Sequence, residues 1–166
     1  MTTYSNTVNS AKNPPMTKHK DIRHHYETRL TPGRENFDIL DWGSRQAQEA
    51  RFAVLAQVLR THQLGTRDRP ASLLDIGCGL TDLQTYLERQ PIFTRYVGVD
   101  ITPAILQEAR RQWPDRELVL ADIFHTNPFP PRAFDVAFCS GVMNLNMGNN
   151  HDFLPGQRQI HQLGQM

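Results

Sequence analysis

The sequence predicts an α/β fold, a parallel sheet with flanking helices. Four short apolar runs have the length of buried strands, at residues 72–76, 95–100, 117–122 and 134–140. Stretches with apolar residues at helical spacing precede the first run and separate the first three. Strands that alternate with helices in this way form right-handed βαβ units, in which the strands pair in parallel.

The composition is that of one ordinary globular domain. Its 166 residues suffice for one core, and a net charge of +1 gives no strong field that would attract nucleic acid or an anionic membrane. There is no apolar span of about 20 residues and no signal-peptide pattern, so a cytoplasmic location is expected. The two cysteines, Cys78 and Cys139, are expected to be free thiols, and no metal site is predicted.

The chain divides into three predicted parts. Residues 1–20 are polar and are expected to form a disordered tail, residues 21–145 form the domain, and residues 146–166 form an irregular C-terminal tail. His24 and His25 are interpreted as a surface pair, because no acidic or cysteine partner for a metal lies at helical spacing from them.

A helix is predicted over residues 44–61. Ser44 is a suitable N-cap, and Gly65 is expected to end the helix in a left-handed conformation. Apolar residues recur at helical spacing at Ala47, Phe52, Val54, Leu55, Val58 and Leu59. A later helix is expected to begin with Thr102 as its N-cap and Pro103 as its first helical residue.

The predicted site is organised around residues 73–82. A short strand is followed by Gly77 and Gly79, which permit a sharp turn and leave no Cβ between the backbone and a ligand. Thr81 is expected to cap the next helix, with Gln84 as the reciprocal partner of a capping box. The helix N-terminus then faces the glycine turn, an arrangement that favours a polar or anionic group of a nucleotide-like cofactor.

Three successive predicted strands end in a carboxylate, at Asp75, Asp100 and Asp122. Asp100 follows Asp75 by 25 residues, a position from which a carboxylate accepts two hydrogen bonds from a ribose diol. Three acids suit a ligand with an ammonium or sulfonium group, a ribose and an adenine, and they would repel a pyrophosphate. Asp82 also stands where the dinucleotide fingerprint requires a third glycine, so an NAD-dependent oxidoreductase is disfavoured but kept as an alternative.

Four segments carry a family resemblance, at residues 73–82, 97–101, 121–123 and 134–136, the last followed by Ser140 and Gly141. Their order and spacing resemble the class I S-adenosylmethionine-dependent methyltransferase family over residues 42–144. The family's glycine pattern is Asp-x-Gly-x-Gly-x-Gly, and here Thr81 replaces the third glycine. The resemblance implies a Rossmann-like fold, S-adenosyl-L-methionine as cofactor, and methyl transfer as the reaction.

The resemblance also implies roles for individual residues. Gly77 and Gly79 would approach the methionine part, Asp100 would hold the ribose hydroxyls, and Asp122 with Ile123 would flank the adenine. The remaining residues that it assigns to cofactor binding are Asp75, Cys78, Ile101, Ser140 and, through the methionine carboxylate, Arg45. The residues alone leave open that the three acids cap turns at the strand ends. No catalytic base is assigned. His125 follows Asp122 and could act as a base, but the reading as a surface loop histidine is preferred.

Only the first four strands of the family's core are predicted. The resemblance therefore implies a C-terminally truncated chain, whose activity is uncertain and whose unpaired sheet edge could associate with another chain. The fourth strand lacks the Asn/Asp-Pro-Pro-aromatic run of enzymes that methylate amino groups of DNA bases or glutamine, which disfavours such acceptors without naming another. A small-molecule acceptor is expected. The alternative function is a non-catalytic S-adenosylmethionine-binding or interaction module.

Overall fold

The computed structural model describes residues 16–123 and 125–142, with side chains from residue 20 onward. Its elements, in chain order, are α1 (Met16–Glu27), α2 (Asn36–Ile39), α3 (Arg45–Thr61), β1 (Ala71–Ile76), α4 (Asp82–Glu88), β2 (Thr94–Asp100), α5 (Pro103–Gln112), β3 (Glu117–Leu120) and β4 (Val136–Cys139). This alternation confirms the predicted α/β fold. Helix α1 begins inside the segment predicted as a tail, whereas residues 1–15 and the predicted C-terminal tail lie outside the described residues.

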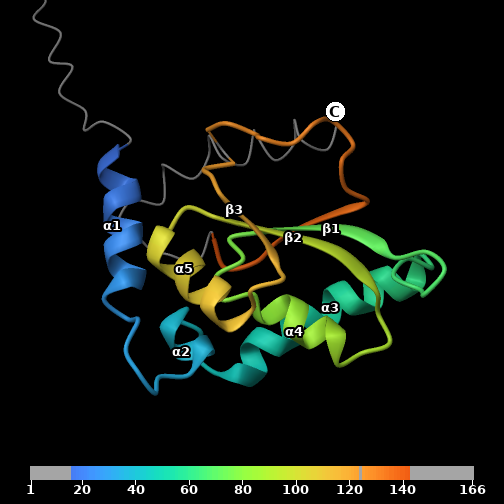
Figure 1. Ribbon diagram of the computed structural model, residues 1–166. Coiled ribbons are helices and arrows are strands. Elements are labelled where there is room, and N and C mark those ends of the chain that lie inside the picture. Colours follow the sequence, from blue (N-terminus) through green and yellow to red (C-terminus); the bar gives the residue numbers. More distant parts are fainter. Residues whose placement is uncertain (1–15, 124, 143–166) are drawn as a thin grey trace, which may run out of the picture.

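The four described strands pair in parallel in the order β3-β2-β1-β4 (Figure 1). Asp75 in β1 lies opposite Gly98 in β2 and opposite Phe138 in β4. The chain moves from β1 through β2 to β3 on one side, and it then returns to place β4 on the other side of β1. The strand order thus reverses at β1, and open α/β sheets bind ligands beyond the carboxyl ends of the strands at such a point.

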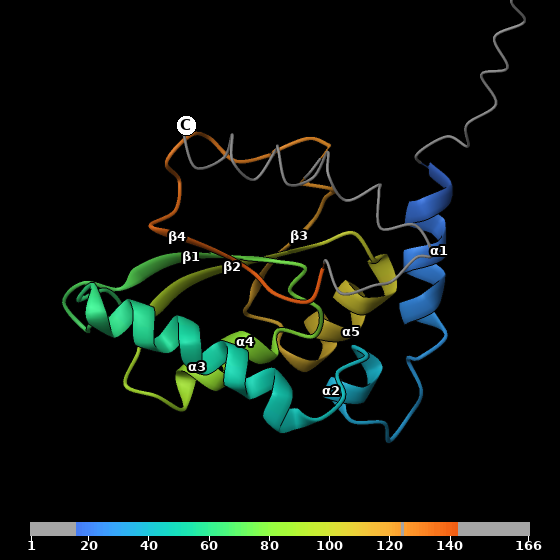
Figure 2. The same ribbon diagram turned by 180° about the vertical axis from the view of Figure 1, so that it is seen from behind.

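Helices and a long connection cover opposite faces of this Rossmann-like sheet. Helices α3 and α4 lie on one face, and residues 121–123 and 125–135, from the connection between β3 and β4, lie on the other (Figures 1 and 2). On the helical face, Phe52 and Leu59 of α3 pack with Leu73 of β1, each contributing about 1.5–3 kcal/mol of burial free energy. The other face buries a second apolar cluster, formed by Leu74, Ile76, Val97, Val99 and Ile123. Alternate residues of β1 therefore supply two cores, as in a strand that is buried on both faces.

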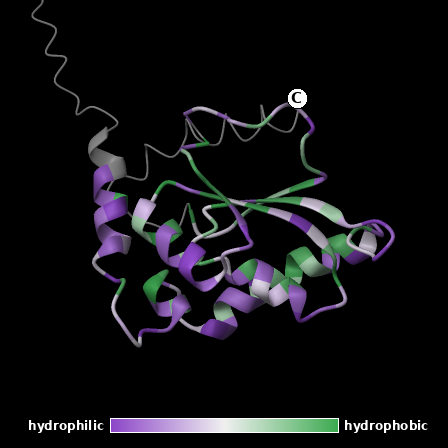
Figure 3. Cartoon of the chain, viewed as in Figure 1, coloured by the Kyte–Doolittle hydropathy of each residue, from purple (hydrophilic) through white to green (hydrophobic). Residues whose placement is uncertain are grey.

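Helix α3 confirms the prediction for its bounds and its N-terminus. The Ser44 hydroxyl accepts a hydrogen bond from the backbone N–H of Ala47 at 3.1 Å. Figure 3 shows hydrophobic residues in the central strands and in α3, and mostly hydrophilic residues in α1. Three of the six apolar positions named for this helix are nevertheless outside the core, since Ala47 is exposed, Val54 is 64% exposed and Val58 is 43% exposed. The buried stripe is narrower than the sequence pattern indicates because α3 contacts its neighbours along one side only.

The predicted left-handed cap at Gly65 is wrong by two residues. Helix α3 ends where Gln63 adopts the left-handed conformation with φ 53°, and the N–H of Leu64 bonds to the carbonyl of Leu59 at 2.9 Å. Gly65 also has a positive φ, of 75°, but its carbonyl accepts a hydrogen bond from the N–H of Phe93 at 2.8 Å. This glycine therefore joins the loop before β1 to the loop before β2.

Helix α5 begins with Pro103 as predicted, but the hydroxyl of Thr102 does not cap it. The N–H of Thr102 instead donates to Oδ1 of Asp100 at 2.8 Å. Within the described residues the buried Oγ1 of Thr102 has no hydrogen-bond partner. The carboxylate at the end of β2 thus takes over part of the capping that the sequence assigned to the threonine.

The N-terminal helices pack beside the sheet, against α5. Helices α1 and α2 lie next to α5 (Figure 1). Tyr26 of α1 and Ile39 of α2 belong to one apolar cluster with Ile105 of α5. The guanidinium of Arg23 donates a hydrogen bond to the carbonyl oxygen of Ile101, which follows β2, at 2.7 Å. In the part of the chain that the structure describes, no helix has both the length and the apolar character needed to cross a membrane.

Candidate functional site

A glycine turn leaves the carboxyl end of β1, where the strand order reverses. Gly77 and Gly79 have φ values of 71° and 54°, in the left-handed region that other residues rarely adopt. The N–H of Gly77 donates to the carbonyl of Val99 in β2 at 2.8 Å. A Cβ on Gly79 would come within 2.7 Å of the Leu40 side chain, and one on Gly77 would overlap Val142. Both positions need glycine for conformation and for space.

Asp100 lies beside this turn, at the end of β2. Its Oδ2 accepts a hydrogen bond from the N–H of Gly79 at 3.1 Å, and its Oδ1 accepts the bond from Thr102. Burial raises the pKa of the Asp100 carboxyl, and the backbone N–H donors oppose that rise. The structure thus brings together Gly77, Gly79 and Asp100. Each carboxylate oxygen keeps a further lone pair for a ligand hydroxyl.

Side chains from residues 26–42 lie near the turns that follow β1 and β4, and most of them were not predicted from the sequence. Leu40 lies against Gly79, and Trp42 lies against the turn that follows β4. Burial raises the pKa of Tyr26 to about 12, and the negative charge of Asp100 adds to that rise. Of Tyr26, Leu40 and Trp42, only Trp42 lies within residues 42–144, the span of the family resemblance.

Asp75 is buried in the core and accepts a hydrogen bond from the Tyr96 hydroxyl at 2.7 Å. Burial raises the pKa of the Asp75 carboxyl to about 7; the bond from Tyr96 opposes the rise, and the charges of Asp100 and Asp82 add to it. Cys78 is also buried, and burial raises the pKa of its thiol well above the usual value. Both residues therefore support the turn from the core.

The predicted capping box at the start of α4 is wrong. Thr81 has φ 66° and ψ 30°, a left-handed conformation, and its side chain makes no cap hydrogen bond. An N-cap that bonds to its own helix requires an extended backbone, which this residue lacks. The hydroxyl of Thr81 instead accepts a hydrogen bond from Arg116, and Oε1 of Gln84 accepts one from the hydroxyl of Thr94 at 2.8 Å.

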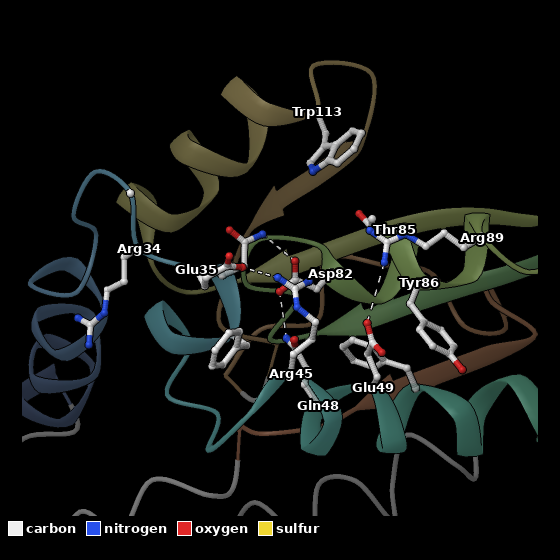
Figure 4. A pocket seen from close by; sticks show the side chains of 14 residues that line it. Arg34, Glu35, Arg45, Gln48, Glu49, Asp82, Thr85, Tyr86, Arg89 and Trp113 are labelled. Atoms are coloured by element: carbon white, nitrogen blue, oxygen red, sulfur yellow. Dashed lines mark hydrogen bonds and ion pairs between the residues drawn. The ribbon is translucent and has the colours of Figure 1, made fainter.

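A pocket of about 380 Å³ lies between residues 33–37, α3 and α4 (Figure 4). Its described lining includes Arg45 and Asp82 but neither glycine of the turn. Arg45 forms an ion pair with Glu35, while Asp82 accepts hydrogen bonds from Asn36 at 2.7 Å and Gln48 at 3.0 Å. The guanidinium of Arg45 is therefore engaged by a carboxylate of this chain rather than directed at the glycine turn.

The other predicted site residues follow the ends of β2, β3 and β4. Ile101 bonds to Arg23 through its carbonyl, and Ser140 is half-buried directly after β4. Ile123 is buried in the second apolar cluster, and the carbonyl of Asp122 accepts hydrogen bonds from the backbone of the following turn. Both cysteines are free thiols, as predicted. No group of three or more potential metal ligands occurs among the residues described.

Residues 74–153 match the family described as "Methyltransferase domain". The matched span begins in β1 and contains the glycine turn, Asp100 and β4. By this match, residues 74–153 are part of a methyltransferase domain.

Curated methyltransferases resemble only part of this chain. The 18S rRNA (guanine-N(7))-methyltransferase of Bos taurus is 35% identical over 92 residues, which are 55% of this chain and 32% of the relative. The trans-aconitate 2-methyltransferase of Methylobacterium nodulans is 34% identical over 74 residues, which are 45% of this chain and 28% of the relative. The chain thus spans about a third of the length of the curated relatives that it matches.

A solved methyltransferase has the same fold as this chain. The magnesium protoporphyrin IX methyltransferase from Synechocystis PCC 6803, solved with bound S-adenosylmethionine, aligns with a TM-score of 0.51 and 16% identity. The alignment covers 80% of this chain and 64% of that structure. At this identity the likeness concerns the fold alone, a parallel sheet with flanking helices.

Proposed function

We propose that this chain binds S-adenosyl-L-methionine at the carboxyl ends of β1 and β2 and takes part in methyl transfer from it. The observation that carries the proposal is the hydrogen bond between Asp100 and Gly79, within the span that matches the methyltransferase family. The bound cofactor supplies a methyl group already activated on a sulfonium. The chain itself then has to hold the cofactor in position and exclude water.

Each residue of the turn has a role in this proposal. The methionine part would lie against the backbone of Gly77 and Gly79, which requires the Val142 and Leu40 side chains beside these glycines to move aside. Asp100 accepts hydrogen bonds from the ribose hydroxyls. Asp122 and Ile123 lie beside the adenine. Ile101 and Ser140 line the same sheet edge, while Asp75 and Cys78 act from the core beneath it.

Arg45 requires a change of partner in this proposal. Its guanidinium pairs with Glu35 and lies 5.8 Å from the centre of the Phe37 ring. It could pair with the methionine carboxylate only after it leaves Glu35. We therefore place Arg45 at the margin of the cofactor site.

We propose a small-molecule methyl acceptor. The 18 basic and 17 acidic residues nearly balance, so the chain has no overall charge that favours a nucleic-acid substrate. A relative that matches part of the chain is a trans-aconitate methyltransferase. Ribosomal RNA is the second candidate, because the Bos taurus relative is an 18S rRNA methyltransferase.

A thermal-shift titration tests the cofactor. S-adenosylhomocysteine, the demethylated product, is expected to raise the melting temperature of the chain, since a ligand that binds only the native state stabilises it by mass action. NAD is the control and is expected to leave the melting temperature unchanged. A shift with NAD and none with S-adenosylhomocysteine would overturn the proposal.

Release of S-adenosylhomocysteine tests the acceptor. The chain is incubated with S-adenosylmethionine and either a panel of small carboxylic acids and amines or a structured ribosomal RNA fragment. Release above the acceptor-free rate with a small molecule supports our proposal, whereas release with RNA alone supports the second candidate. Cofactor binding without release in either case would favour the non-catalytic module.

A further inference from the structure

Thr81 has a backbone conformation that suits glycine better than threonine. Its φ of 66° lies in the left-handed region, which is strained for a β-branched residue, and its side chain is fully buried. The family's glycine pattern has its third glycine at this position, so the chain keeps the turn while placing a bulkier residue in it. Such a conformation persists only where the surroundings hold it.

Arg116 supplies the surroundings that hold Thr81. Its Nη1 donates to the carbonyl oxygen of Thr81 at 2.9 Å and also to the Thr81 hydroxyl. Its Nη2 donates to Glu88 of α4 at 2.9 Å, and its guanidinium lies 4.0 Å from the centre of the Trp113 ring. The Arg116 side chain is only 8% exposed. A planar guanidinium with fixed donors, packed on an aromatic ring, is well suited to fix two oxygens of one residue.

The two residues meet across 35 positions of sequence. Arg116 lies immediately before β3, whereas Thr81 ends the glycine turn of β1 and directly precedes α4. The N–H of Thr81 donates to the carbonyl of Cys78 at 2.9 Å. The backbone conformation at Thr81 therefore determines whether this hydrogen bond forms and closes the turn from Cys78 to Thr81. That segment contains Gly79, whose N–H binds Asp100.

We propose that Arg116 is a positioning residue for the cofactor turn, acting through Thr81. Its hydrogen bonds hold Thr81 in the left-handed conformation, which a glycine at position 81 would adopt without such support. The inference rests on the proposed cofactor site and adds a residue outside the glycine motif that controls its geometry. Loss of the arginine lets Thr81 leave the left-handed conformation, so that only a fraction of molecules presents the turn in its binding form.

Four variants test this role by calorimetric titration with S-adenosylhomocysteine. Arg116→Ala is expected to raise the dissociation constant about tenfold, as when a tenth of the molecules is competent to bind. Thr81→Gly is expected to bind like the wild type. In the double variant, Thr81→Gly should restore binding to Arg116→Ala, because glycine keeps the left-handed turn without a clamp. Arg111→Ala is the matched control, since that arginine is 73% exposed and pairs with Glu108 on the surface of α5.

Hydrogen exchange of the ligand-free chain supplies a second measurement. Exchange in peptides covering residues 77–82 should rise in Arg116→Ala and fall again in the double variant. A double variant that still binds weakly would show that Arg116 acts only through Glu88 and Trp113, and would overturn the inference. Equal affinities of Arg116→Ala and wild type would also overturn it while leaving the cofactor site standing. A wild type that does not bind S-adenosylhomocysteine would overturn the proposed function and, with it, the positioning role.

Discussion

The carboxylate of Asp100 accepts a hydrogen bond from the backbone N–H of Gly79, which joins the end of β2 to the turn after β1. The same carboxylate also accepts the N–H of Thr102 at the start of α5. One side chain thus fixes the spacing between the glycine turn and the next helix. It does so at the edge where open α/β sheets bind ligands.

Asp100→Ala is expected to impair both ligand binding and folding. Loss of a charged acceptor should weaken S-adenosylhomocysteine binding by about 1.5–3 kcal/mol, and two backbone N–H groups without their partner should lower the free energy of unfolding by about 1–3 kcal/mol. Calorimetric titration and urea denaturation measure the two effects. Asp68→Ala, at an exposed position, is the control. Unchanged affinity in Asp100→Ala would reject the ribose role.

The buried Asp75 should make the stability of the chain depend on pH. Its pKa is raised to about 7, so the folded chain keeps a proton that the unfolded chain loses near pH 4. Between these values the free energy of unfolding should fall as pH rises, by at most about 1.4 kcal/mol per pH unit, and above pH 7 this contribution should be constant. Urea denaturation at intervals from pH 4 to pH 8 measures the slope.

Asp75→Asn is the variant that isolates this slope. The asparagine oxygen still accepts the Tyr96 hydroxyl, but the side chain no longer titrates. The variant should therefore match the wild type near pH 4 and be more stable at pH 8. A smaller slope should remain, because burial also raises the pKa of Asp100. Parallel profiles for the two proteins would show that Asp75 does not titrate as proposed.

Gly79→Ala should disrupt the cofactor turn. The new Cβ would lie 2.7 Å from the Leu40 side chain, and the φ of 54° is unfavourable for alanine. We expect a loss of about 1–3 kcal/mol in the free energy of unfolding and a loss of S-adenosylhomocysteine binding. Gly43→Ala is the matched control, since a Cβ there meets no atom within 4 Å. Equal effects at the two glycines would contradict the role assigned to the turn.

Substitution of the two residues at helix N-cap positions should affect the free energy of unfolding differently. Ser44→Ala is expected to lower the free energy of unfolding by about 1 kcal/mol, because the Ser44 hydroxyl accepts the N–H of Ala47. Thr102→Val should cause no loss, because its buried hydroxyl has no partner among the described residues and valine keeps the shape. Urea denaturation of both variants decides the point. A comparable loss in Thr102→Val would show that its hydroxyl does cap α5.

Local patterns in the sequence determined the order and type of the main elements. Apolar runs of strand length predicted all four described strands, and Ser44 and Pro103 marked the starts of α3 and α5 correctly. The resemblance assigned glycines 77 and 79 and the acid at the end of β2 to one cofactor, and they lie together because parallel strands bring their carboxyl ends to one edge. These features depend on residues a few positions apart or on a topology that chirality restricts.

Only the tertiary structure decided which partner each polar side chain has. Thr81 looked like an N-cap from its neighbours, but Arg116, 35 residues away, takes its hydroxyl. Asp75 was predicted to bind the cofactor from the end of its strand, and in the structure Tyr96, 21 residues away, is its partner, while burial raises its pKa. A buried polar group must find a hydrogen-bond partner, and which one comes within reach depends on how the strands and helices pack. Sequence spacing indicates the helix or strand in which a residue lies, whereas tertiary packing determines the group with which its side chain interacts.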